Sequence, residues 1–120
     1  MIIGTGIDIV DMDRVKKACE RESFCKRVYT EEERRQAGNS VSRLAGDFAV
    51  KEAVAKALGT GFSGFGPEDI EVLREQSGRP FVRLYGGAAA RAGELGISAI
   101  HVSITNTRET AAAFAVAAGN

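Results

Sequence analysis

Hydrophobic and polar positions along the chain predict a mixture of short strands and helices. Ile2–Val10 is an apolar run rich in isoleucine, which is typical of a buried strand. Thr30 and Glu33 form a capping-box pattern that predicts the start of a short helix. Further elements are expected at Met12–Arg21 (a helix capped by Asp11), Asp69–Arg74 and Pro80–Leu84 (strands joined by a turn at residues 76–79), Ala88–Leu95 (a helix) and Ala99–Thr105 (a strand).

The clearest helical pattern covers Val41–Leu58, and Gly59 is expected to end it in a left-handed conformation. Three of its polar residues, Arg43, Asp47 and Lys51, are expected to point to solvent. The apolar stripe expected to face the core consists of Val41, Leu44, Ala45, Phe48 and Ala55.

The C-terminal segment Thr110–Ala118 fits two structures. Its alanines favour a helix, whereas the alternation of Ala112, Phe114 and Val116 fits a strand paired in a hairpin. The mixed order of elements predicts an α+β fold. A length of 120 residues predicts one domain, 1–120, and a core so small that a subunit interface would help to stabilise it.

Charge and cysteine usage narrow the possible functions. The chain has 16 basic and 16 acidic residues, which argues against a general nucleic-acid binder. Its two cysteines fit no zinc or redox motif, and two free thiols are typical of a reducing cytoplasm. The N-terminus lacks the features of a signal peptide. Leu95–Thr107, the longest uncharged run, is shorter than the ~20 residues that cross a membrane.

Asp8 is a charged residue inside the apolar run at the N-terminus. A buried carboxylate costs several kcal/mol unless it is paired or bound to a metal. The alternative is that Asp8 lies at the frayed end of the strand and caps the following turn. The sequence alone leaves both interpretations open.

Glu52 and Lys56 break the pattern of the long helix in the same way. At about 100° per residue, Glu52 falls in the centre of the apolar stripe, and Lys56 follows one turn later. They could form an ordinary surface pair four residues apart, but that fits an inward-facing pair poorly. Two carboxylates without a histidine or cysteine cluster suit Mg²⁺, and a nearby lysine suits phosphate. Asp8, Glu52 and Lys56 therefore indicate Mg²⁺-dependent phosphate chemistry.

A basic stripe is expected on the first helix. Arg14, Lys17 and Arg21 are spaced so that they share one helix face. Such a stripe is usually only a solvated surface. The functional alternative is a docking face for an acidic partner.

Two motifs resemble one known family. Residues Gly6–Arg14 look like its G-x-D-x5-R segment, and Phe48–Gly61 looks like its F-x-x-K-E-A-x-x-K-A-x-G-T-G signature. Both are similar to the holo-acyl-carrier-protein synthases, which are small phosphopantetheinyl transferases. The resemblance covers essentially the whole chain and is supported by Gly78-Arg79-Pro80 and by the segment that begins at His101.

The resemblance implies a phosphopantetheinyl transferase-like fold, with a small antiparallel sheet packed against a long central helix. It implies transfer of the 4′-phosphopantetheine arm of coenzyme A to a serine of apo acyl carrier protein, with release of 3′,5′-ADP. Asp8 and Glu52 would hold Mg²⁺, Lys56 would contact the pyrophosphate, and Arg14, Lys17 and Arg21 would dock the carrier protein. The protein would be a cytoplasmic homotrimer with the coenzyme between protomers. Further coenzyme contacts would come from Gly59, Gly61, Arg79, Pro80, Thr105 and Asn106.

Two positions depart from the family pattern. Asp47 stands where an arginine is common, and Thr105-Asn106 stands where Ser-His is usual. Both family positions lie near the nucleotide half of coenzyme A, so a carboxylate at position 47 is expected to repel phosphate. A non-catalytic coenzyme-binding relative is one alternative, which the intact Asp8, Glu52 and Lys56 oppose. Transfer to a polyketide or peptide synthetase carrier domain is another, which the short chain opposes.

Overall fold

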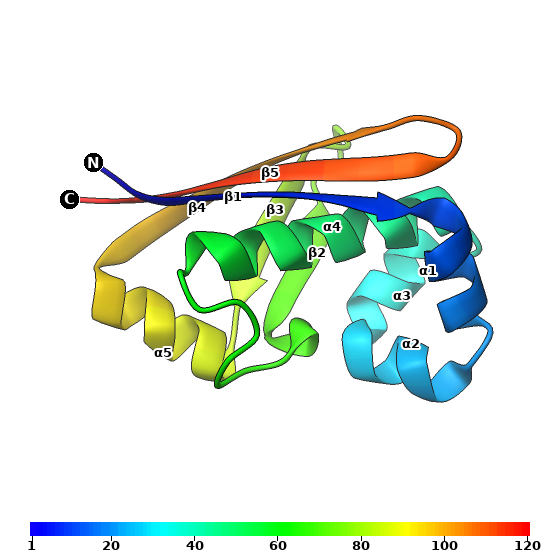
Figure 1. Ribbon diagram of the computed structural model, residues 1–120, viewed down its shortest axis with the longest axis horizontal. Coiled ribbons are helices and arrows are strands. Elements are labelled where there is room, and N and C mark those ends of the chain that lie inside the picture. Colours follow the sequence, from blue (N-terminus) through cyan, green and yellow to red (C-terminus); the bar gives the residue numbers. More distant parts are fainter.

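The computed structural model describes residues 1–120 and combines two antiparallel sheets with helices packed against one side (Figure 1). The larger sheet has the strand order β1-β5-β4, and β2 and β3 form a separate hairpin. The elements are β1 (Ile2–Asp11), α1 (Met12–Cys19), α2 (Glu22–Val28), α3 (Glu31–Ala37), α4 (Val41–Ala57), a 3-10 turn (Pro67–Asp69), β2 (Ile70–Arg74), β3 (Pro80–Leu84), α5 (Gly86–Leu95), β4 (Ile97–Asn106) and β5 (Thr110–Gly119).

The α+β class is confirmed, and the open question at the C-terminus is resolved as a strand. β5 lies between β1 and β4 and pairs with both, so its backbone groups are satisfied on both sides. Its buried residues alternate with less buried ones, which is the strand pattern. The predicted capping box is present, since Thr30 Oγ1 accepts from the backbone N–H of Glu33 and Glu33 Oε1 accepts from that of Thr30.

Strand β1 lies directly on helix α4. A Cβ atom at Gly4 would overlap the carbonyl oxygen of Ala57, and one at Gly6 would overlap that of Ala53. Glycine is therefore required at both positions, because only a residue without a Cβ atom lets the strand backbone approach the helix backbone so closely. This contact fixes the position of β1 along the helix.

The prediction that β1 is a buried strand was wrong for one of its faces. Ile7 is 65% exposed and Ile9 is 67% exposed, because no element of the chain covers the face of the sheet opposite α4 (Figure 1). The alternative in which Asp8 lies at a frayed strand end was also wrong. Asp8 is inside β1, where it pairs with Ala113 of β5.

The predicted first helix was too long. α1 ends at Cys19, and the chain turns before α2 begins at Glu22. Arg21 is the N-cap residue of α2, so Arg14, Lys17 and Arg21 do not share one helix. Sequence reasoning missed α2 because its N-cap makes no side-chain hydrogen bond, and thus carries no capping signal.

The expected orientation of α4 was partly wrong. Asp47 and Lys51, which were expected to face solvent, are buried. The helix lies beneath the sheet and beside the hairpin β2-β3, so it is covered on most sides (Figure 1). Its tightest core contacts come from Ala49, Val50, Ala53, Val54 and Ala57.

Candidate active site

Asp8 and Lys56 meet where β1 crosses the second half of α4. Lys56 Nζ donates to the backbone carbonyl of Ile7 at 2.9 Å and lies 3.3 Å from Asp8 Oδ1. The side chain of Lys56 is 52% exposed and that of Asp8 is 18% exposed. Lys56 therefore keeps one N–H donor available to a bound anion, and Asp8 is the less exposed partner of the pair.

Glu52 lies beside Asp8 in the same cavity, which has a volume of about 380 Å³. Burial raises the pKa of Glu52, the charge of Asp8 raises it further, and Lys56 lowers it. The expectation that Glu52 and Lys56 point into the core was wrong, because Glu52 is half-buried at the cavity and Lys56 is at the surface. The structure nevertheless brings Asp8, Glu52 and Lys56 together.

The donor set fits Mg²⁺ better than a metal that needs a full cage of protein ligands. No group of three or more histidine, cysteine, aspartate or glutamate side chains is placed to hold a metal ion. Two carboxylates at an open cavity match the way Mg²⁺ binds in proteins, with water and substrate phosphate as its other ligands. Burial is the main cause that raises the pKa of Glu52, and a cation would relieve the added repulsion from Asp8.

Two predicted glycines lie close to this centre. Gly59 and Gly61 have φ angles of +82° and +59°, which glycine adopts without strain. Their N–H groups donate to the carbonyls of Lys56 and Ala55, at 2.9 and 3.2 Å. The loop after α4 is thereby folded back onto the end of the helix that carries Lys56.

The cavity extends from the carboxylates to the exposed helices α1 and α2. Arg14 lines it, whereas Lys17 and Arg21 are exposed outside it, and none of the three is paired with an acidic side chain. Two aromatic residues also line the cavity: Phe24, which sequence reasoning missed, and Phe48, which was expected in the core-facing stripe. Their rings are 6.4 Å apart and meet edge to face. An acidic partner with an apolar surface could contact both the cations and these rings.

Two of the remaining predicted coenzyme residues line a second groove, near the start of α4. This groove of about 320 Å³ includes Pro80 and Asn106, and Arg79 lies in the turn beside it. Asn106 Nδ2 donates to Ser42 Oγ at 2.7 Å. Thr105 does not line the groove but is exposed on the uncovered face of the sheet. Arg43 and Arg74 also line the groove, and no local pattern in the sequence indicates this role for them.

The buried ammonium group of Lys51 fixes α4 against the rest of the molecule. Lys51, whose side chain is fully buried, donates to Glu33 Oε1 at 2.8 Å and to the carbonyls of Pro67 and Ile70 at 2.9 and 2.6 Å. Three acceptors satisfy all three of its donors. Glu33 Oε2 in turn accepts from the backbone of Val72 at 2.9 Å. Burial lowers the pKa of Lys51, and Glu33 opposes that change.

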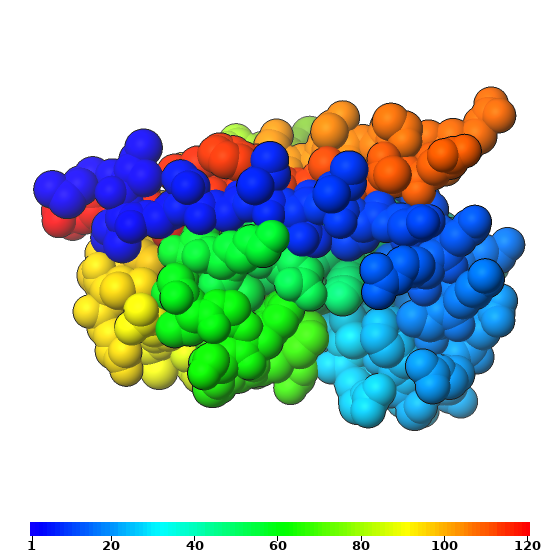
Figure 2. Space-filling model, in the orientation of Figure 1, coloured from blue at the N-terminus to red at the C-terminus, as the bar shows by residue number.

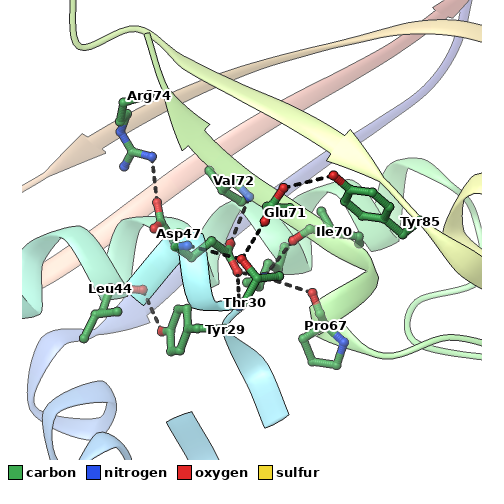
Figure 3. Close-up of polar contacts among 12 residues, drawn as sticks. Tyr29, Thr30, Leu44, Asp47, Pro67, Ile70, Glu71, Val72, Arg74 and Tyr85 are labelled. Carbon is green, nitrogen blue, oxygen red and sulfur yellow. Dashed lines mark hydrogen bonds and ion pairs between the residues drawn. The ribbon is translucent and has the colours of Figure 1, made fainter. Parts of the chain in front are cut away.

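The network continues through the capping residue of α3. Thr30 Oγ1 donates to Glu71 Oε2 at 2.6 Å, and Tyr85 donates to the other oxygen of Glu71 at 3.1 Å (Figure 3). Tyr29 donates to the carbonyl of Leu44 at 2.7 Å. The helix that carries Glu52 and Lys56 is thus anchored on the side away from the cavity.

Other reactive side chains lie apart from the carboxylate pair. His101 is exposed on β4, opposite Val116 of β5. Cys19 and Cys25 are free thiols, as expected, and burial raises the pKa of Cys19 to about 12, which keeps it protonated at neutral pH.

Comparison with known proteins identifies the family. A sequence model of the 4′-phosphopantetheinyl transferase superfamily matches residues 4–116. The holo-[acyl-carrier-protein] synthase of Lachnoclostridium phytofermentans is 47% identical over 116 residues, which cover 97% of this chain and 95% of that protein. The chain belongs to the holo-acyl-carrier-protein synthase family. It is accordingly a transferase of the phosphopantetheinyl transferase class.

Solved structures of holo-acyl-carrier-protein synthases share the fold. The enzyme of Neisseria meningitidis superposes with a TM-score of 0.88 at 35% identity, covering 98% of this chain and 99% of that one. The Bacillus anthracis synthase, solved in complex with CoA (3′,5′-ADP), gives a TM-score of 0.83 at 32% identity, covering 100% and 99%. The predicted phosphopantetheinyl transferase-like fold is therefore confirmed.

Proposed function

We propose that this holo-acyl-carrier-protein synthase transfers 4′-phosphopantetheine from coenzyme A to a serine of apo acyl carrier protein in a Mg²⁺-dependent reaction that releases 3′,5′-ADP. The observation that carries the proposal is that Asp8 and Glu52 line one open cavity and that Lys56 forms an ion pair with Asp8, in a chain of this family. The coenzyme complex of the Bacillus anthracis relative supports coenzyme A as the donor.

The reaction forms one phosphorus–oxygen bond and breaks another. The serine oxygen attacks the phosphorus next to the pantetheine arm. The bond between this phosphorus and the bridging oxygen of the pyrophosphate breaks, and 3′,5′-ADP leaves with that oxygen. Asp8 and Glu52 would hold Mg²⁺, which when bound neutralises charge on the pyrophosphate. Lys56, with its ammonium group half exposed beside Asp8, contacts the same phosphates. Asp8, Glu52 or a carboxylate-bound water accepts the serine proton.

The loop after α4 and the second groove complete the coenzyme site in this proposal. Gly59 and Gly61 bring the backbone close to the pyrophosphate, because no side chain intervenes. Arg79, Pro80 and Asn106 contact the nucleotide half at the groove, and Thr105 does so from the adjoining sheet face.

The carrier protein would dock on α1 and the start of α2. Arg14, Lys17 and Arg21 are exposed and unpaired, so they are available to the acidic recognition helix of a carrier protein. Arg14 also lines the cavity that holds the two carboxylates. A serine on the docked helix would thereby enter next to Asp8 and Glu52.

The proposed assembly is a homotrimer with the coenzyme between neighbouring protomers. Glu52 and Ser42 are ten residues apart on α4, which is about 15 Å along the helix axis. The carboxylate pair and the second groove are therefore separated within one protomer. A neighbouring copy would bring its own groove to the carboxylates of the first.

The decisive experiment incubates the protein with coenzyme A, Mg²⁺ and an apo carrier protein, and weighs the carrier by mass spectrometry. The carrier should gain the mass of the phosphopantetheine group only when Mg²⁺ is present. Glu52→Gln should abolish the gain and keep the fold, whereas Glu31→Gln, at an exposed position of α3, should not. An unmodified carrier would reject the function, and normal turnover of Glu52→Gln would reject the metal role.

A further inference from the structure

The guanidinium group of Arg74 reaches the second groove from the last residue of β2. Arg74 lines this groove, and its side chain is only 11% exposed. Its backbone is held in place by Gln36, whose Oε1 accepts from the N–H of Arg74 at 2.9 Å. Nη2 of Arg74 lies 3.9 Å from the place where a Cβ would stand on Gly46, which also lines the groove. The absence of a side chain on Gly46 leaves space at this edge of the guanidinium.

Asp47 holds the opposite part of the same guanidinium. Its Oδ1 lies 2.7 Å from Nη1 of Arg74, and its side chain is 3% exposed (Figure 3). The contact is an ion pair without the alignment of a hydrogen bond. Asp47 itself does not line the groove. Its carboxylate is paired with Arg74 and does not face a ligand in the groove. The expectation that Asp47 repels phosphate therefore does not follow from its position.

The groove has the charge and the donors that a phosphate group needs. Two arginines and no acidic residue line it, and Nε of Arg43 is buried without a hydrogen-bond partner. Ser40 caps the first turn of α4 at the same place, where the positive end of the helix dipole lies. The other polar lining residues are Ser42, Ser103 and Asn106.

We propose that Arg74, oriented by Asp47, binds the 3′-phosphate of coenzyme A. This inference rests on the proposed function. Coenzyme A carries a pyrophosphate and one phosphomonoester, and the pyrophosphate belongs with Lys56 and the carboxylates. The groove is separate from that centre, so the anion left for it is the phosphomonoester. A guanidinium can form two parallel hydrogen bonds to a phosphate. Because Asp47 already holds one side of the Arg74 guanidinium, the other side is oriented to make such bonds. The hairpin, and not α4, thus supplies the cation at this position.

The test measures the affinities of coenzyme A and of 3′-dephospho-coenzyme A, which lacks only the phosphomonoester, by titration calorimetry. Arg74→Met should weaken coenzyme A binding by about tenfold or more, since it removes a charge-assisted pair. Its affinity for the dephosphorylated ligand should stay within about twofold of the parent. Asp47→Asn should reduce the preference for coenzyme A in the same direction, because Arg74 then loses its orienting partner.

Two further variants keep the test decisive. Asp47→Leu/Arg74→Met removes both buried charges and maintains packing if Arg74→Met alone does not fold, and it should show the same loss of preference. Arg83→Met, on the paired strand β3 and exposed, is the matched control and should bind both ligands normally. The inference is overturned if Arg74→Met binds coenzyme A like the parent, loses both ligands equally, or is matched by Arg83→Met. A parent protein that binds neither ligand and modifies no carrier would instead overturn the proposed function as well.

Discussion

Lys51 shows at the residue scale how one buried charge can hold three elements together. It joins α4 to α3 through Glu33, and to the 3-10 turn and the start of β2 through the carbonyls of Pro67 and Ile70. Lys51→Met should lower the free energy of unfolding by about 3–5 kcal/mol, because it leaves Glu33 buried without its cation. Urea unfolding followed by circular dichroism measures this loss.

The matched control for Lys51 is an exposed lysine with a similar partner. Lys26 lies 3.0 Å from Glu22 on the surface of α2. Lys26→Met should change stability by less than about 1 kcal/mol, since exposed pairs contribute little. Equal effects of Lys51→Met and Lys26→Met would contradict the anchoring role.

Asp47 should make stability depend on pH. Burial raises its pKa to about 6 from the ordinary 3.8, against the opposing pull of Arg74. The folded state thus holds the proton more tightly than the unfolded state. The stability that this protonation contributes is fully present below pH 3.8 and is lost as the pH rises through about 6.

The measurement compares the pH dependence of unfolding in the parent and in Asp47→Asn, which cannot titrate. Between pH 4 and 6, the parent should lose stability relative to the variant by up to about 1.4 kcal/mol per pH unit. Parallel curves for the two proteins would show that Asp47 is not the group responsible.

Sequence patterns identified Asp8, Glu52 and Lys56 because each breaks a local rule, although two of them lie nearer the surface than expected. The patterns missed Asp47 and Lys51 because polar residues on a helix ordinarily face water. Their partners, Arg74 and Glu33, are distant in sequence and come close only in the folded chain. No local periodicity contains that information.

At the scale of elements, α1 carries the part of the docking face that is easiest to test. Arg14→Glu should weaken carrier-protein binding by about tenfold and make it less sensitive to salt, because it reverses an interfacial charge. Lys16→Glu is the control, since Lys16 is exposed about 200° further around the same helix. Surface plasmon resonance with an apo carrier protein distinguishes the two, and equal losses would remove Arg14 from the docking face.

Elements were predictable where the signal is local. The capping box at Thr30, the turn between β2 and β3 and the glycine after α4 all came from short-range chemistry. The ambiguity at residues 110–118 could not be resolved locally, because an alanine-rich segment becomes a strand only through its pairing with β1 and β4. Tertiary contacts decide its structure, not propensity.

At the scale of the whole molecule, the uncovered sheet face is the surface on which copies would meet. Ile7 and Phe114 are paired across β1 and β5, and they are 65% and 44% exposed. Ile9 follows on the same face, and β1 runs along the exposed front of the molecule (Figure 2). Apolar patches of this kind mark protein interfaces.

None of the helices has the length and apolar character needed to span a membrane.

Phe114→Glu should convert the proposed trimer into monomers and abolish transfer, because it would place a charge in the proposed apolar interface. Light scattering after size-exclusion chromatography gives the mass, and Phe114→Leu, which keeps the contact apolar, should behave like the parent. A monomeric parent protein, or a trimeric and active Phe114→Glu, would exclude this face as the interface.

The glycines of β1 have a final consequence for how such enzymes can diversify. Since Gly4 and Gly6 set main chain directly upon main chain, no side chain between β1 and α4 sets the separation of the two backbones that carry Asp8 and Glu52. That separation is a property of the scaffold, and a single methyl group at Gly6 would alter it. The charges of Asp47 and Arg74, near the other end of α4, rest on side chains alone, so substitutions can exchange them without changing the backbone contact beside the two carboxylates.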